Sequence, residues 1–364
     1  MMNLKMNYLL GLCLFLLVQL ANAQDSLKYV DAKTLVTIGK AKATEQWFQR
    51  IDSNETVTMP KTVQGLAKNS AGIAIIFETN SPVISAKWTL AEDKYMANMT
   101  PIAHSGLDLY CLKDGKWQFV SPGRPDKGAL NQSQVIIRRM DTTMKQFLLY
   151  LPLYNSVTNL SIGVKTESVL KAPQKVAVNK AKRVVIYGSS IVQGASASRP
   201  GMAYPAMLQR QLGMDVINLG FSGNAKMEME VAKYLATVEG DCYVLDCIPN
   251  QAPEQISERA LPFIKYLRDK RPKTPIILVE TVIREHGYFD QQVGNSVRKQ
   301  NENIHKAYQQ LLKENYKQIY YVPATAFMGN DHDGTVDGTH LTDLGFDRIA
   351  KAVAKEIEKA RAKD

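Results

Sequence analysis

Two polar motifs far apart in the sequence contain the residue types of a serine nucleophile and its base. Ser190 lies in Gly188-Ser189-Ser190-Ile191, and His340 ends the motif Asp337-Gly338-Thr339-His340. A serine hydroxyl is a weak nucleophile until a base accepts its proton, and an imidazole does so when a carboxylate fixes its tautomer. The motifs therefore predict acyl transfer, with Ser190 as nucleophile, His340 as base and Asp337 as the orienting carboxylate.

The tetrahedral intermediate of acyl transfer needs hydrogen-bond donors for its oxyanion. Gly223 and Asn250 lie between the two motifs and could supply such donors together with the Ser190 amide. A glycine lets its N–H approach closely, and the asparagine side chain is a neutral donor. These three residues are the predicted oxyanion hole.

Each of these motifs follows, or lies close after, a short apolar run in the second half of the chain. Continuous apolar runs separated by helical patterns are typical of a parallel sheet buried on both faces, whose ligands lie beyond the carboxyl ends of the strands. One helix is expected to bury Val297, Ile304, Tyr308, Leu311 and Leu312, and the last helix to begin near Thr342. The runs are 184–187, 216–219, 242–245, 276–279 and 319–322.

The first half of the chain has a different pattern, with alternating residues and turns from Thr56 to Val164. Asp114-Gly115 between two runs predicts a hairpin, because Asp-Gly accepts the positive φ angles of a type I′ turn. We expect an all-β sandwich or jelly roll, with strands in 72–77, 83–88, 107–110, 117–120 and 146–150.

The ordered blocks around Ser190, Gly223, Asn250 and Asp337/His340 resemble those of the SGNH (GDSL-type) hydrolase family over roughly residues 182–355. Two positions depart from the family pattern. Ser189 replaces the aspartate of Gly-Asp-Ser, and the Gly-x-Asn-Asp block reads Ile248-Pro249-Asn250-Gln251. The nucleophile and the asparagine amide are retained, so the two differences are expected to affect only the geometry of the loops that form the oxyanion hole.

The resemblance extends into the first half of the chain. Tyr187-Gly188-Ser189-Ser190-Ile191 and Ala197-Ser198-Arg199-Pro200-Gly201 look like the subgroup that carries an amino-terminal β domain. The Gly-x-Asp-Leu-Tyr signature of that domain appears as Gly106-Leu107-Asp108-Leu109-Tyr110. The resemblance implies a three-layer α/β/α hydrolase domain at 173–364, preceded by a β-sandwich domain at 24–172.

The first 23 residues have the pattern of a secretory signal peptide. Lys5 precedes an apolar run from Leu9 to Val18, and Ala21-Asn22-Ala23 matches a cleavage site. The run is shorter than the ~20 residues of a membrane span, so we expect an exported protein without stable membrane insertion. A lipoprotein anchored at Cys13 is the alternative, although the apolar run continues beyond that residue.

The charge and the cysteine content argue against a nucleic-acid-binding site and against a disulfide framework. The net charge of +10 becomes +9 when Lys5 is removed, but basic and acidic residues alternate along the chain, which favours a solvated surface over a nucleic-acid site. Cys111, Cys242 and Cys247 form an odd set after cleavage, which indicates buried thiols and no disulfide framework. Cys242 and Cys247 are expected on opposite faces of a strand.

Three further residues are candidate substrate contacts: Arg199, Asp108 within an apolar strand, and His286 after the fourth strand of the sheet. Trp88, Trp117 and Tyr110 could stack on sugars, although packing is the default for them. The Asn330–Asp333 segment lacks a recognised metal-ligand spacing and indicates a polar loop. His305 is expected to face solvent.

These observations predict an exported serine esterase that requires no metal or organic cofactor. Exported enzymes that resemble this subgroup suggest short acyl groups, above all acetyl, on carbohydrate. A lipid or phospholipid esterase and a carbohydrate-binding protein with a vestigial hydrolase domain remain alternatives. The oligomeric state stays open.

Overall fold

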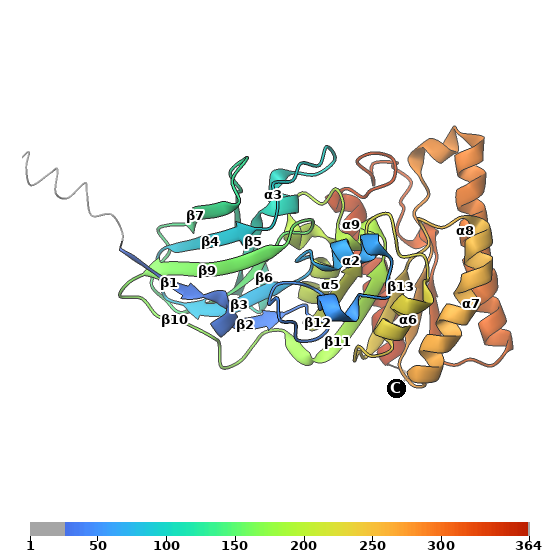
Figure 1. The fold of residues 1–364 in the computed structure, drawn as a ribbon, viewed down its shortest axis with the longest axis horizontal. Coiled ribbons are helices and arrows are strands. Elements are labelled where there is room, and N and C mark those ends of the chain that lie inside the picture. Colours follow the sequence, from blue (N-terminus) through green and yellow to red (C-terminus); the bar gives the residue numbers. More distant parts are fainter. Residues whose placement is uncertain (1–25, 363–364) are drawn as a thin grey trace, which may run out of the picture.

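The computed structural model describes residues 26–362 and contains a β-rich part and an α/β part that lie side by side along the long axis (Figure 1). The expected signal peptide at 1–23 lies outside the described residues. The β-rich part comprises the strands up to Lys171, and the α/β part begins with a strand at Asn179.

The α/β part is built on a five-stranded parallel sheet in the order β12-β11-β13-β14-β15. The five predicted runs are its strands: β11 (Asn179–Gly188), β12 (Met214–Gly220), β13 (Cys242–Asp246), β14 (Ile276–Val279) and β15 (Ile319–Val322). The strand order reverses between β11 and β13, and doubly wound sheets bind ligands at that point. Ser190 follows β11 and therefore lies at this position.

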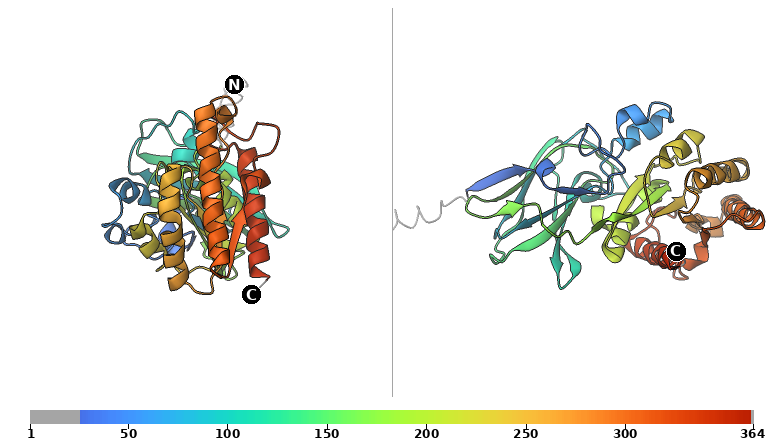
Figure 2. Two further views of the ribbon diagram at one scale, coloured as in Figure 1. Left: turned by 90° about the vertical axis from the view of Figure 1, so that its right-hand side faces the viewer. Right: turned by 90° about the horizontal axis from the view of Figure 1, so that it is seen from below.

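Helices cover both faces of the sheet, which confirms the expected three layers. One face packs against α5 (Tyr204–Leu212) and α9 (Asp343–Arg361). The other packs against α6 (Met229–Leu235), α7 (Pro253–Lys270) and α8 (Gln291–Lys313). At the end of the molecule away from the β-rich part, α8 lies between α7 and α9 (Figure 2).

The helix predictions are largely confirmed. Val297, Ile304 and Leu311 are buried on α8. Leu312, predicted on the same face, is 46% exposed, because one further residue turns the side chain by about 100° around the helix. Thr342 caps α9, and its Oγ1 accepts a hydrogen bond of 3.2 Å from the Gly345 N–H.

The β-rich part is a sandwich of two antiparallel sheets, as expected. Asp114 and Gly115 join two of its strands with φ angles of 50° and 74°, which confirms the predicted hairpin turn. One sheet has the order β1-β9-β4-β7, from β1 (Leu27–Asp31), β9 (Val157–Lys165), β4 (Ile84–Leu90) and β7 (Asn131–Ile137). The other has the order β10-β3-β8-β5-β6, from β10 (Leu170–Lys171), β3 (Ala74–Thr79), β8 (Lys145–Tyr150), β5 (Leu107–Lys113) and β6 (Lys116–Gly123), and β2 (Val36–Ile38) pairs with β3.

The central strands β3 and β8 of the second sheet are buried on both faces. Phe77 and Phe147 point into the sandwich, where their rings stack with centroids 5.4 Å apart. Leu148 and Tyr150 point the opposite way and pack against Ala206 of α5. Double burial explains why these antiparallel strands have continuous apolar runs instead of strict alternation.

A segment between β2 and β3 leaves the sandwich and packs on the α/β part. The segment contains α2 (Lys61–Ala67), a helix that the all-β prediction from Thr56 did not include. Arg50 lies fully buried beneath it and donates hydrogen bonds to the carbonyls of Asn218 (3.1 Å) and Gly220 (2.7 Å). Burial lowers the pKa of Arg50 to about 9. Arg50 therefore links this segment to the end of β12.

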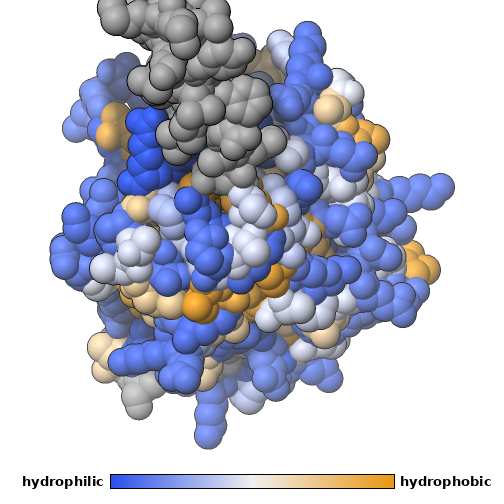
Figure 3. All heavy atoms as spheres, turned by 90° about the vertical axis from the view of Figure 1, so that its left-hand side faces the viewer, coloured by the Kyte–Doolittle hydropathy of each residue, from blue (hydrophilic) through white to orange (hydrophobic). Residues whose placement is uncertain are grey.

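Of the three cysteines within residues 26–362, two are buried and none forms a disulfide. Cys242 lies in the core under α5 and α9, and Cys247 in the core under α6 and α7, so the predicted opposite faces are confirmed. The sandwich end of the molecule is mainly hydrophilic, with smaller apolar groups between the hydrophilic ones (Figure 3). Within residues 26–362, no helix has the length and apolar character needed to cross a membrane.

Candidate active site

The nucleophile loop is a tight turn between β11 and the short helix α4 (Ser190–Gln193). Gly188 ends the strand, where a Cβ atom would lie 2.1 Å from Val192 Cγ2 and 2.3 Å from the Asp246 carbonyl oxygen. Ser189 caps the helix, and its Oγ accepts a hydrogen bond from the Ile191 N–H. This packing holds Ser190 at the first position of α4, where it is 6% exposed.

The structure brings Ser190, His340 and Asp337 into one hydrogen-bonded chain, which we call the triad. Ser190 Oγ lies 2.9 Å from His340 Nε2, across 150 positions of sequence. His340 Nδ1 lies 2.7 Å from Asp337 Oδ2. Since the carboxylate can only accept, the proton of the neutral ring is on Nδ1, and Nε2 is free to accept the serine proton.

The turn that carries Asp337 and His340 is fixed by its own backbone. Asp337 Oδ1 accepts hydrogen bonds from the N–H groups of Thr339 (3.1 Å) and His340 (2.8 Å). Gly338 has a φ of +82°, which a residue with a side chain rarely adopts. Partial burial alone would raise the pKa of Asp337, but the hydrogen bonds that it accepts lower this pKa to about 2.

The loops with Gly223 and Asn250 lie next to the nucleophile helix and next to each other. The Ser222 N–H donates to the Gln193 side chain of α4 at 3.0 Å. Asn250 Nδ2 donates to the Asn224 carbonyl at 2.9 Å, so one of its two amide hydrogens is used and the other is left for a ligand. Gly223 has a φ of +71° and open space where a Cβ would lie. The Gly223 loop thus lies beside the helix that begins at Ser190, and the Asn250 loop lies beside the Gly223 loop.

Asn98, from the β-rich part, reaches the triad and was missed by the sequence analysis. Its Nδ2 donates to Asp337 Oδ2 at 3.1 Å. The neighbouring residues anchor it, because Met99 is buried in the core of the α/β part and Thr100 Oγ1 donates to the Ser198 carbonyl at 2.6 Å. An asparagine in a loop is ordinary turn chemistry, so no local pattern could have indicated this role.

Asp108 and Arg199, two predicted substrate contacts, bind each other where the sandwich meets the α/β part. Arg199 Nη1 donates to Asp108 Oδ2 at 2.8 Å, and the Gly201 N–H donates to the same oxygen at 2.8 Å. Arg199 also contacts the Tyr110 hydroxyl. Burial raises the pKa of Asp108 to about 6 against the opposing charge of Arg199. Asp108 is fully buried, so it is not the substrate contact that the sequence suggested: its carboxylate joins the two parts of the molecule.

His286 is exposed beside the triad turn, as its candidate role requires. It belongs to the short helix η4 (Glu285–Tyr288), whose first N–H donates to the Gly338 carbonyl at 2.9 Å. A Cβ on Gly338 would lie 3.2 Å from His286 Nδ1. Arg284, the residue before η4, donates from Nη2 to the Pro249 carbonyl at 3.0 Å. This helix therefore lies between the Asn250 loop and the triad turn.

Asp246 at the end of β13 is a buried acid that the sequence analysis did not select. Its carboxylate accepts a hydrogen bond of 3.0 Å from the Tyr204 hydroxyl, and its carbonyl accepts one from the Ser189 N–H. Burial raises the pKa of Asp246 to about 7. The acid lies beneath the nucleophile loop and not on the surface.

The other candidates have structural contacts. Asp331 forms an ion pair with Arg348. His305 is partly exposed and packs edge-on against Tyr321. Trp88 and Tyr110 are buried, which favours packing over sugar stacking. Among residues 26–362, no group of three His, Cys, Asp or Glu side chains is arranged to hold a metal ion.

Comparisons with known proteins agree with this architecture. The GDSL-like lipase/acylhydrolase family matches residues 181–358, and the GxDLY amino-terminal domain of SGNH-hydrolase-type esterases matches residues 27–170. A crystal structure of a putative GDSL-like lipase from Bacteroides ovatus is 46% identical, with a TM-score of 0.89 over 93% of this chain and 98% of that one. A search of curated sequences found no match.

More distant structures share the fold alone. The salicylyl-acyltransferase SsfX3 of a tetracycline biosynthetic pathway is 17% identical, with a TM-score of 0.72 over 93% of this chain and 98% of that one. A family two carbohydrate esterase from Cellvibrio japonicus is 12% identical, with a TM-score of 0.60 over 92% and 98%.

A parallel-sheet domain with a serine, a histidine and an aspartate at its carboxyl edge, together with these relatives, defines a carboxylic ester hydrolase. The chain belongs to the GDSL-like lipase/acylhydrolase family, in the subgroup whose amino-terminal domain carries the GxDLY motif.

Proposed function

We propose that the protein is an exported serine esterase that removes acetyl or similar short acyl groups from carbohydrate. The observation that carries the proposal is the triad, with 2.9 Å between Ser190 Oγ and His340 Nε2 and 2.7 Å between His340 Nδ1 and Asp337 Oδ2. These contacts match the nucleophile, base and orienting acid of acyl transfer.

The proposed reaction has two steps. Ser190 Oγ attacks the ester carbonyl while His340 Nε2 takes the hydroxyl proton, and Asp337 stabilises the resulting imidazolium. The imidazolium then protonates the leaving alcohol, which leaves an acyl-serine ester. Water attacks that ester with the same base, the acid is released, and Ser190 regains its proton. The N–H groups of Ser190 and Gly223 and the Asn250 amide hold the oxyanion in both steps.

The acyl group and the acceptor are supported by related folds. A family two carbohydrate esterase and an acetyl xylan esterase from Butyrivibrio proteoclasticus share the overall architecture at 12% and 13% identity. Export is supported by the sequence of residues 1–23. Amino-terminal sequencing of the secreted product tests the predicted cleavage after Ala23, which would make Gln24 the first residue.

The test compares the wild type with Ser190→Ala on p-nitrophenyl acetate, butyrate and octanoate. Ser190-dependent release that is fastest on acetate supports the proposal. Preference for octanoate would favour a lipid esterase instead. Equal rates of the variant and the wild type on all three esters, with no acetate released from acetylated xylan, would favour a carbohydrate-binding protein with a vestigial hydrolase domain.

A further inference from the structure

An exposed aromatic hollow lies beside the triad turn. It has a volume of about 640 Å³ and is lined by Glu285, His286, Tyr288, Phe289 and His332, which we call the η4 pocket. Phe289 is 88% exposed and Tyr288 is 47% exposed. Side chains of this size are mostly buried in soluble proteins, so two exposed aromatic rings in one hollow indicate a contact surface.

The η4 pocket lies next to the site of the proposed reaction. The Glu285 N–H donates to the carbonyl of Gly338, which stands between Asp337 and His340 in the triad turn. Arg284, the residue before η4, donates to the Pro249 carbonyl in the Asn250 loop. The helix η4 is thus attached to the triad turn and to the Asn250 loop, which places the pocket beside the site of the proposed reaction.

The pocket combines aromatic faces with polar groups. His332 Nδ1 donates to Glu285 Oε2 at 2.9 Å, and its ring meets the Tyr288 ring edge-on with centroids 4.8 Å apart. These contacts hold Tyr288 and His332 in place while Phe289 stays exposed. A sugar ring has the complementary surface, with an apolar C–H face for an aromatic ring and hydroxyls around its edge for a carboxylate or an imidazole.

We propose that the η4 pocket binds the sugar ring of the acyl acceptor, with Phe289 and Tyr288 as the stacking residues. The proposal rests on the proposed function, since it assigns the alcohol side of the same ester. The Glu285 carboxylate and the His286 imidazole in the lining can hydrogen-bond to the hydroxyls of a sugar, which a long acyl chain does not have. The pocket therefore determines which alcohol is presented to the triad.

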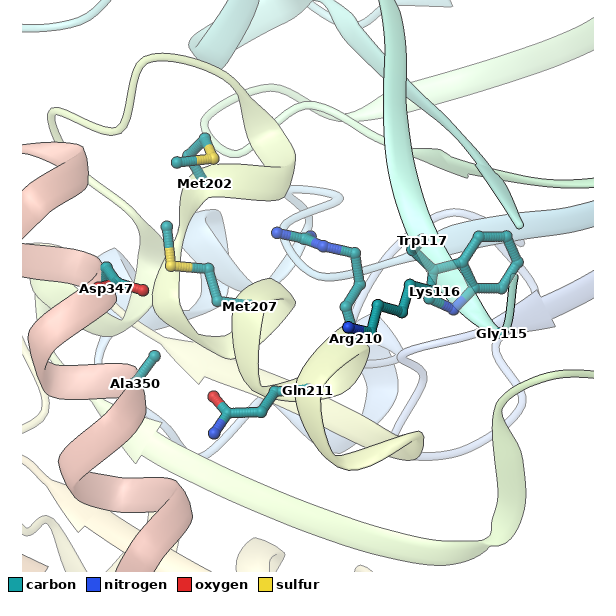
Figure 4. A pocket seen from close by; sticks show the side chains of 9 residues that line it. All are labelled: Gly115, Lys116, Trp117, Met202, Met207, Arg210, Gln211, Asp347 and Ala350. Carbon is teal, nitrogen blue, oxygen red and sulfur yellow. The ribbon is translucent and has the colours of Figure 1, made fainter. Parts of the chain in front are cut away.

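A second hollow offers a matched control. It has a volume of about 620 Å³ and lies where the β5–β6 hairpin meets α5 and α9, with Trp117 and Lys116 on one side and Asp347 on the other (Figure 4). Met202, Met207, Arg210, Gln211 and Ala350 complete its lining on the side of the sheet that α5 and α9 cover. It shares no lining residue with the η4 pocket.

The experiment compares acetate release from an acetylated xylo-oligosaccharide with release from 2,2,2-trifluoroethyl acetate, whose alcohol has no ring. For Phe289→Ala and Phe289→Leu, the ratio of kcat/KM on the oligosaccharide to kcat/KM on the small ester should fall about tenfold, mainly through KM. Leucine keeps an apolar side chain but lacks the flat face. Trp117→Ala should leave the ratio unchanged.

Two outcomes would overturn the proposal. An unchanged ratio in both Phe289 variants would show that the ring does not contact the acceptor, and full retention in Phe289→Leu alone would indicate a hydrocarbon contact instead.

Binding separates this proposal from the proposed function. Titration of the Ser190→Ala protein with the same acetylated oligosaccharide should show binding that Ser190→Ala/Phe289→Leu weakens about tenfold, even if the wild type releases no acetate. Equal affinity of the two proteins, or no binding to either, would reject the pocket as a sugar site. Hydrolysis of the oligosaccharide that does not depend on Phe289 would support the esterase activity and reject only the proposed sugar site.

Discussion

Asn98 Nδ2 donates a hydrogen bond of 3.1 Å to Asp337 Oδ2, and the two residues are 239 positions apart in sequence. The same carboxylate oxygen lies 2.7 Å from His340 Nδ1. The β-rich part therefore supplies a donor to the acid of the triad, in addition to packing against the α/β part. This contact leads to the first prediction.

Replacing Asn98 with alanine should lower kcat about tenfold, because a hydrogen bond to a charged group contributes ~1.5–3 kcal/mol and this one is only partly buried. Asn98→Asp should move the acid limb of the pH–rate profile to higher pH, since a second carboxylate near the ring favours the imidazolium, which cannot act as base. The pKa of Asp337 is lowered to about 2, so the titration of Asp337 itself does not contribute to this acid limb. Profiles of both variants that overlay the wild type would show that Asn98 does not position the acid.

Replacing Asn250 with alanine should lower kcat about 100-fold with little change in KM, because the amide meets charge that develops only in the transition state. Initial rates on p-nitrophenyl acetate measure both constants. Since Asn250 also donates to the Asn224 carbonyl, circular dichroism should verify that the variant keeps its fold. A rise in KM at constant kcat would assign Asn250 to ground-state binding.

Asp246→Asn should stabilise the protein at alkaline pH. Burial raises the folded-state pKa of Asp246 to about 7, above its ordinary value of 3.8. The wild type therefore loses stability as pH rises from about 4 to 7, where folding must keep the acid protonated, and a neutral amide avoids this loss. Thermal unfolding at pH 4 should give similar Tm values, and at pH 8 the variant should melt at least about 2 °C higher. A Tm difference that does not change with pH would contradict this assignment.

Asp108→Ala should lower the free energy of unfolding by about 3 kcal/mol, because it leaves the partly buried Arg199 guanidinium and the Gly201 N–H without their acceptor. Urea denaturation measures the change. Asp331→Ala is the matched control, since it breaks the more exposed ion pair with Arg348 and should cost less than about 1 kcal/mol. Equal losses in the two variants would mean that Asp108 does not hold the two parts together.

Local patterns in the sequence were sufficient to predict the α/β fold and the residues that meet at its active site. The segments that form β11 to β15 are continuously apolar because helices cover both faces of the sheet. This pattern can be recognised in the sequence before the helices that pack on each strand are known. Parallel strands end at one edge of the sheet. Ser190, Asn250 and His340 could therefore be expected together before any contact was known.

The sequence pattern was weaker where packing is not periodic. The segment with Arg50 and α2 has no strand or helix signal long enough to show that it leaves the sandwich, and its place depends on carbonyls at the end of β12. Leu311 and Leu312 are adjacent apolar residues on α8, but only Leu311 is buried. The elements that pack against α8 decide where its buried face ends.

The tertiary structure alone decided which polar residues meet. Asp108 looked like a cleft residue because a carboxylate in an apolar strand is unusual, and its partner Arg199 is 91 positions away. Asn98 and the η4 pocket likewise have no distinguishing local motif. The periodicity of a sequence indicates whether a side chain is buried. It does not indicate which residue of the other part of the molecule that side chain contacts, because this depends on how the β-rich part and the α/β part pack together. The sequence therefore determined the fold and the triad, and the docking of the two parts determined what surrounds them.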